Sequence, residues 1–162
     1  MKNIILSLFT LLLVSACSSG STVADTPFNV TGLFQGEFEN TSGSRRSTFT
    51  LNIVEDVDSG DISGNLIFAD EGDDDSGCTF NGLVTGSTAG FSVALVASVS
   101  GINEDPEVDE NGDPVEQTVS GTINYQLTQS NSGNRMTGTY VTIGLGSCSN
   151  ASGAGSVVIN RI

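Results

Sequence analysis

The sequence predicts an all-β protein, an eight-stranded antiparallel up-and-down barrel in which strands adjacent in the chain are neighbours in space. Three observations favour this fold. From about residue 30 onward, runs of alternating apolar and polar residues recur, as in strands with one buried face. Gly, Asn, Asp and Ser separate these runs. None of them has the three-to-four spacing of an amphipathic helix. A two-sheet β-sandwich is the alternative.

The predicted strands, in chain order, are Val30–Phe38, Ser47–Val54, Asp61–Phe68, Cys78–Thr85, Phe91–Val99, Gln117–Leu127, Arg135–Ile143 and Gly155–Arg161. Alternate positions of a strand face the same side, so the apolar set of each should point inward. The large inward residues that we expect to fill the interior are Phe49, Leu51, Phe91, Leu95, Ile123 and Tyr125.

Three strands share a glycine that follows a hydroxyl residue, in Ile62-Ser63-Gly64-Asn65, Val119-Ser120-Gly121-Thr122 and Met136-Thr137-Gly138-Thr139. A glycine inside a strand often marks a sharp bend or a bulge, which lets a sheet curl until it closes. Closure would also remove the exposed sheet edges. These glycines therefore favour a barrel.

The N-terminus has the anatomy of an export signal. Lys2 and Asn3 precede an apolar run, Ile4 to Val14, which is too short to span a bilayer as a helix. The sequence Val14-Ser15-Ala16-Cys17 then resembles the lipobox of bacterial lipoproteins. That resemblance implies removal of residues 1–16 and lipidation, including palmitate, of Cys17. An ordinary secreted protein with a coincidental cysteine is the alternative.

The organisation that follows is a signal peptide at 1–16, a lipidated cysteine with a flexible tether at 17–29, and one β-barrel domain at 30–162. The tether prediction follows from its small, polar residues. Several acyl chains on Cys17 would hold the protein at a membrane. In proteins of this type, Ser18 after the cysteine implies the outer membrane of the cell envelope.

The strand number and order resemble those of the small lipocalin-like and avidin-like barrels. Thr31-Gly32-Leu33-Phe34 is similar to the Gly-x-Trp motif that opens lipocalins, with Phe34 in place of the Trp. The resemblance implies an eight-stranded meander barrel. Because fold similarity does not carry function, no ligand is transferred with it.

The composition narrows the function classes. Removal of residues 1–16 takes away the only lysine, so four arginines face nineteen carboxylates and the formal net charge changes from −14 to −15. Such a chain should repel nucleic acid. The mature chain has no His, Lys or Trp, and most general bases and activated nucleophiles need His or Lys. We therefore expect no enzymatic activity, with a carboxylate-based hydrolase as a remote alternative.

The two remaining cysteines, Cys78 and Cys148, should form a disulfide in an oxidising compartment. A free pair or a metal dithiolate is the alternative. In a meander, all even-numbered strands start at the same end of the barrel. Cys78 opens the fourth strand and Cys148 lies just before the eighth, so both belong to that end. The tether enters the first strand at the opposite end.

Because alternate connections of a meander lie at the same end of the barrel, two acidic loops should lie at the end that holds the cysteines. The predicted loops at 69–77 and 100–116 carry twelve of the nineteen carboxylates: Asp70, Glu71, Asp73, Asp74, Asp75, Glu104, Asp105, Glu107, Asp109, Glu110, Asp113 and Glu116. They either solvate the rim and keep the protein monomeric, or bind a basic partner or a cation. The weak calcium-site candidates are Asp109, Asn111, Asp113, Glu116, Asp73 and Asp75, whose spacing only partly follows an EF-hand loop. We expect no other cofactor.

The sequence thus predicts a non-enzymatic, lipid-anchored envelope protein that acts as an interaction or structural module. Its acidic loops should face away from the membrane and form the contact surface. The alternative is a carrier of a small apolar molecule, because eight strands can enclose either a packed core or one small ligand.

Overall fold

The computed structural model describes residues 27–41, 46–69, 78–108, 110–112, 114–145, 148 and 153–162, with the backbone alone at 46, 69, 104–108 and 114–116. Its strands are β1 (Gly32–Asn40), β2 (Arg46–Glu55), β3 (Asp61–Ala69), β4 (Cys78–Ala89), β5 (Ser92–Val108), β6 (Pro114–Gln129), β7 (Arg135–Ile143) and β8 (Ala154–Arg161). The described residues include no helix that could span a membrane.

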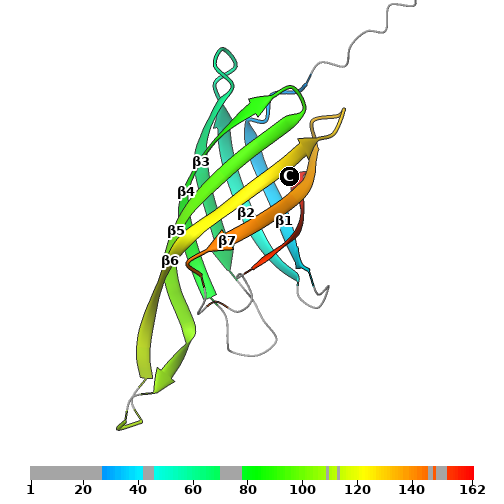
Figure 1. Cartoon of the computed structure of the whole chain (residues 1–162). Coiled ribbons are helices and arrows are strands. Elements are labelled where there is room, and N and C mark those ends of the chain that lie inside the picture. Colours follow the sequence, from blue (N-terminus) through cyan, green and yellow to red (C-terminus); the bar gives the residue numbers. More distant parts are fainter. Residues whose placement is uncertain are drawn as a thin grey trace, which may run out of the picture.

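The strands form one closed antiparallel barrel in the order β1 to β8, with β8 pairing back to β1 (Figure 1). The predicted all-β fold and its up-and-down order are confirmed, and the two-sheet alternative is wrong. Each of the eight predicted strands overlaps an observed one, and β7 has the predicted bounds. Closure leaves the barrel wall without an unpaired edge.

Alternate side chains of every strand fill the interior. The buried apolar residues are Val30, Phe34, Phe38, Phe49, Leu51, Ile53, Ile62, Leu66, Phe68, Cys78, Phe80, Val84, Val93, Leu95, Ala97, Val99, Val119, Ile123, Tyr125, Leu127, Met136, Tyr140, Leu145, Cys148, Val157 and Ile159. Phe38 lies at the centre of an aromatic cluster, with ring centroids 4.5 Å from Phe49 and 4.6 Å from Tyr140.

Glycines on the inner face make room for this packing. Gly36 pairs with Phe49 across β1 and β2, and a Cβ on Gly36 would fall 2.0 Å from an atom of the Phe49 ring. A Cβ on Gly64 would lie 2.1 Å from the Asn52 carbonyl oxygen of the neighbouring strand. Backbone approaches this close are open only to glycine, which allows the sheet to bend sharply.

Two sequence predictions need correction. The segment 100–116 is not simply a loop, because β5 runs to Val108 and β6 begins at Pro114. Its acidic and proline residues hide the alternation that a half-buried strand would show. Phe91, expected to face inward on the fifth strand, is a half-buried turn residue that precedes β5.

Candidate functional site

The end of the barrel from which β5 and β6 project is closed by a disulfide. The predicted bond between Cys78 and Cys148 is present, with the two Cα atoms 5.7 Å apart and 70 positions apart in the chain. Cys78 opens β4, and Cys148 lies between β7 and β8. Both cysteines are buried. The bond therefore fastens the β7–β8 connection to the barrel wall, as chain parity predicted.

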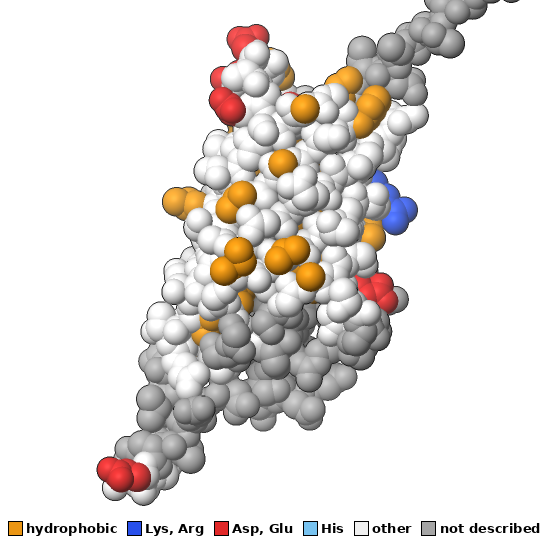
Figure 2. Space-filling model, viewed as in Figure 1, with side chains coloured by type: hydrophobic (Ala, Val, Ile, Leu, Met, Phe, Trp, Pro, Cys, Tyr) orange, Lys and Arg blue, Asp and Glu red, His pale blue; other side chains and the backbone are white. Residues whose placement is uncertain are grey.

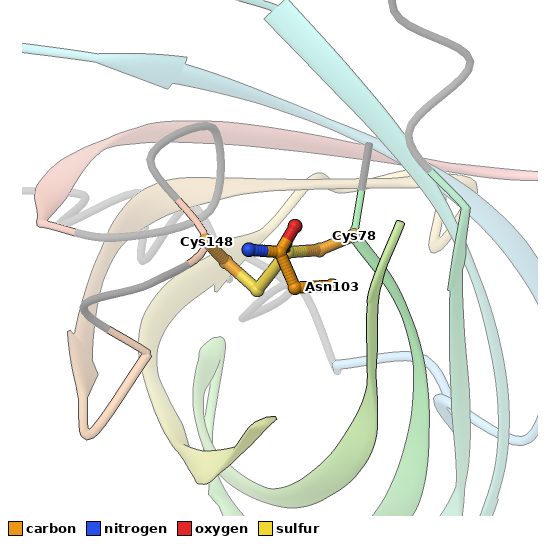
Figure 3. Close-up of a disulfide and its surroundings, with 3 residues drawn as sticks. All are labelled: Cys78, Asn103 and Cys148. Atoms are coloured by element: carbon orange, nitrogen blue, oxygen red, sulfur yellow. Dashed lines mark hydrogen bonds between the residues drawn. A yellow bond between two sulfur atoms is a disulfide. The ribbon is translucent and has the colours of Figure 1, made fainter. Parts of the chain in front are cut away.

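Asn103 lies beside this disulfide (Figure 3). Its Oδ1 atom is 3.7 Å from the Sγ atom of Cys78. A disulfide sulfur has no proton to donate, so this is a packing contact. Asn103 pairs with Gln117 at the last regular position of the β5–β6 ladder inside the barrel.

Beyond that pair, β5 and β6 continue as a two-stranded arm that projects past the barrel (Figure 1). Pairing is interrupted between Asn103 and Glu107, then resumes at Glu107 with Val115 and ends at Val108 with Pro114. Residues 104–106 of β5 thus face one residue of β6. A bulge of this kind redirects a hairpin, and proline is tolerated within it. We call residues 104–116 the acidic arm.

The structure fixes the position of some predicted acidic residues and not of others. Glu110, next to the tip of the acidic arm, is exposed. The β3–β4 connection starts after Ala69 and ends at Cys78, so it belongs to the disulfide end. Its carboxylates, at 70, 71, 73, 74 and 75, lie outside the described residues, as do Asp109 and Asp113.

The calcium hypothesis stays a prediction, because most of its candidate residues lie outside the described ones. Asn111 is an exposed turn residue at the arm tip, and Glu116 belongs to β6, where its side chain is not described. The other candidates, Asp73, Asp75, Asp109 and Asp113, lie outside the described residues. The arm tip connects two paired strands, whereas an EF-hand loop connects two helices. Among the described side chains, no three His, Cys, Asp or Glu gather as a metal site.

The opposite end of the barrel is closed by the segment that leads into β1, a feature that the sequence analysis missed. Arg161 of β8 donates to the carbonyl oxygens of Thr31 at 2.6 Å and Asn29 at 3.0 Å, and its guanidinium lies over the Phe34 ring. Glu55 accepts a hydrogen bond from the backbone N–H of Val30 at 2.8 Å. We call residues 28–31, which these hydrogen bonds hold at this end of the barrel, the plug; Val30 is fully buried, whereas the other three are exposed.

The interior has one unsatisfied polar atom among the described residues, the hydroxyl of Tyr125. Burial, together with the nearby Tyr140, raises the pKa of Tyr125 well above its ordinary value of 10.0. Burial also raises the pKa of Tyr140. Aromatic and aliphatic side chains surround the Tyr125 ring, whose centroid is 5.9 Å from that of Phe49. A phenol in this setting stays neutral.

Of the six residues expected to fill the interior, all but Phe91 are buried and point inward. Phe34, Phe38, Phe68, Phe80 and Tyr140 add five more buried rings. Rings that stack as closely as Phe68 and Phe80, with centroids 4.3 Å apart, fill the space that an apolar ligand would need. The packing of the described residues thus gives the carrier alternative no support.

Comparison with family models, with curated proteins and with solved structures gave no match.

Proposed function

We propose that this chain is a non-enzymatic lipoprotein of the cell envelope that acts as an interaction module, and that its acidic arm binds a basic partner. The observation that carries the proposal is the arrangement of the two ends. The segment after the predicted tether enters β1 at the plugged end, whereas the acidic arm projects from the disulfide end (Figure 1). A lipid on Cys17 would therefore leave the arm facing away from its membrane.

The packing of the barrel supports an interaction module over a carrier. Almost all of its described buried side chains are apolar, and the disulfide and the plug hold the two ends. A rigid body of this kind can present a contact surface without rearrangement, which lowers the entropic cost of binding. The carboxylates of the arm provide a field that attracts cationic partners and depends on salt concentration.

The anchor is tested by the substitution Cys17→Ser. We expect the unchanged chain to incorporate radiolabelled palmitate and to fractionate with membranes, and the variant to do neither while keeping its fold. Cys148→Ser is the control, because loss of the disulfide should not remove the lipid. If the Cys17→Ser chain still incorporates palmitate, the lipobox interpretation is wrong.

The contact surface is tested by photo-crosslinking in the native envelope. A crosslinking residue placed at Glu110, on the arm, should capture a specific partner that is lost at high salt. The same residue placed at Val57, exposed in the turn between β2 and β3 at the plugged end, is the matched control. Equal capture from both positions, or none from Glu110, would reject the arm as the contact surface.

An arm-deleted chain provides a second test. Because regular pairing reaches Asn103 and Gln117, an Asn-Gly turn can replace residues 104–116 and close the hairpin at that pair. We expect the shortened barrel to fold and to lose the partner.

The cation alternative is tested by unfolding the full chain in Ca²⁺. A site with a dissociation constant near 1 mM would stabilise the chain by about 1.4 kcal/mol at a Ca²⁺ concentration ten times that constant. An unchanged melting temperature in Ca²⁺ would exclude it.

A further inference from the structure

On one side of the barrel wall, none of the described outward side chains is charged, although the chain has a formal net charge of −14. We call the outward residues of β3 to β6 in this region the uncharged wall. They are Ser63, Asn65, Ile67, Thr79, Asn81, Leu83, Thr85, Val96, Ser98, Ser100, Ile102, Thr118, Ser120, Thr122 and Asn124. Figure 2 shows this side covered by uncharged and hydrophobic side chains, with acidic groups at the ends of the barrel and at its margin.

The uncharged wall is hollowed by a shallow trough. Two adjoining hollows, of about 550 Å³ and 260 Å³, share Ile67, Asn81 and Ser100. Gly82 lies in the first hollow and Gly101 in the second. At both glycines the neighbouring strand comes so close that an added Cβ would lie 2.1 Å or less from a backbone oxygen. The trough therefore lies over two of the close strand approaches that only glycine permits.

The trough offers unused hydrogen-bonding groups beside aliphatic ones. Asn65, Asn81, Ser98 and Ser100 are exposed, and their side chains make no hydrogen bond with any other described residue. Register places Leu83 between Asn65 and Ser98, and Asn81 between Ile67 and Ser100. The side chain of Leu83 is 69% exposed and that of Ile67 58%. Amide, hydroxyl and aliphatic groups thus alternate across three strands.

This chemistry restricts the ligand. An ionic ligand would lose hydration in the trough without gaining an opposite charge. A peptide that binds by strand addition needs a free sheet edge, and the closed barrel has none. The cores of protein interfaces are depleted in serine, which is abundant here. What remains is a thin, uncharged molecule with many hydroxyl or amide groups and with C–H faces that can pack on Leu83 and Ile67.

We propose that the trough over Gly82 and Gly101 binds an uncharged oligosaccharide. Asn65 and Asn81 can each donate and accept hydrogen bonds with sugar hydroxyl or acetamido groups, as can the two serine hydroxyls. The aliphatic side chains cover the C–H face of the sugar ring. The site is separate from the acidic arm and does not depend on the lipid anchor.

The test uses the Cys17→Ser chain and a panel of neutral glucan, mannan and chitin oligosaccharides, with chemical-shift changes and calorimetry as readouts. At least one probe should bind at millimolar or lower concentration, with equal affinity at low and physiological salt. Asn81→Asp, which keeps the side-chain size, should weaken binding by about tenfold because it removes a donor and buries a charge. Asn160→Asp, an exposed site on β8, is the control and should bind normally.

Three results would overturn the proposal. The first is the absence of binding by every neutral probe at millimolar concentration, with the fold verified by circular dichroism. The second is binding that Asn81→Asp leaves unchanged. The third is that the unchanged chain sediments as a dimer and Leu83→Asp as a monomer, while the substitution leaves sugar binding unchanged. That result would identify the uncharged wall as a contact between two copies of the chain. A deacetylated, cationic chitin oligomer distinguishes arm binding, because its affinity should fall as salt increases.

Discussion

The buried hydroxyl of Tyr125 makes a sharp prediction, because Tyr125→Phe removes one unsatisfied polar atom and leaves the ring in place. A buried group without a hydrogen-bond partner costs about 1–3 kcal/mol of folding free energy. We therefore expect Tyr125→Phe to stabilise the chain by about 1 kcal/mol or more, which raises the melting temperature by about 4 °C. Urea unfolding of the Cys17→Ser chain measures the change.

The same substitution should alter the response to alkaline pH. The folded pKa of Tyr125 is raised, so its titration leaves stability unchanged below pH 10 and lowers stability as the pH rises above 10, because only the unfolded chain ionises there. The slope for one such group is about 1.4 kcal/mol per pH unit. Outside the predicted signal peptide, the chain has no lysine and only two tyrosines. Tyr125→Phe should therefore flatten the loss of stability above pH 10.

Tyr140→Phe is the matched control for both effects. Tyr140 also lines a surface groove with Glu39 and Asn40, and its hydroxyl is not among the buried unsatisfied atoms. Its substitution should change stability less, although the raised pKa of Tyr140 gives it a smaller alkaline slope of the same sign. If Tyr125→Phe instead destabilises the chain by 1 kcal/mol or more, the hydroxyl has a partner and the reasoning fails.

The other predictions concern the elements that close the barrel. Reduction of the Cys78–Cys148 bond should lower the free energy of unfolding by about 4 kcal/mol, because the 70-residue separation makes the unfolded chain much less restricted without the bond. Urea unfolding with and without reductant measures this loss. A much smaller loss would mean that strain in the folded state offsets the entropic gain. Gly64→Ala should lower the free energy of unfolding by about 2–4 kcal/mol, because the added methyl group clashes with the backbone of the neighbouring strand. Gly90→Asn is the control: Gly90 lies in an open left-handed turn, so this change should cost less than about 1 kcal/mol. Equal changes in melting temperature would contradict the close approach at Gly64. Arg161→Ala should release the plug, seen as faster amide hydrogen exchange at residues 28–31, and unchanged protection there would refute the clamp.

Much of the barrel could be predicted from local pattern. Alternation placed Phe49, Leu51 and Ile53 on the inner face of β2, as observed. Parity along a meander then placed Cys78 and Cys148 at one end, and they are bonded. Both inferences depend only on the period of a strand and on the order of strands, which a single sequence carries.

The acidic arm shows where local pattern fails. In an isolated two-stranded ribbon, neither face packs against a core, so the sequence shows no apolar alternation. Residues 100–116 were therefore predicted as a loop, although β5 and β6 continue through most of them. The charge of this segment and its end of the barrel were evident from sequence, but its extended pairing and its bulge were not.

By itself, the sequence determined the all-β class, the strand order, the cysteine pair and the acidic character of one end, because strand periodicity and parity are properties of the chain. Tertiary structure alone decided which groups meet across strands. The Arg161 clamp on Asn29 and Thr31 joins positions more than a hundred residues apart, and the trough at Asn81 depends on the register of β3, β4 and β5. Register and barrel curvature emerge only when the inner side chains pack together, so no local pattern encodes them.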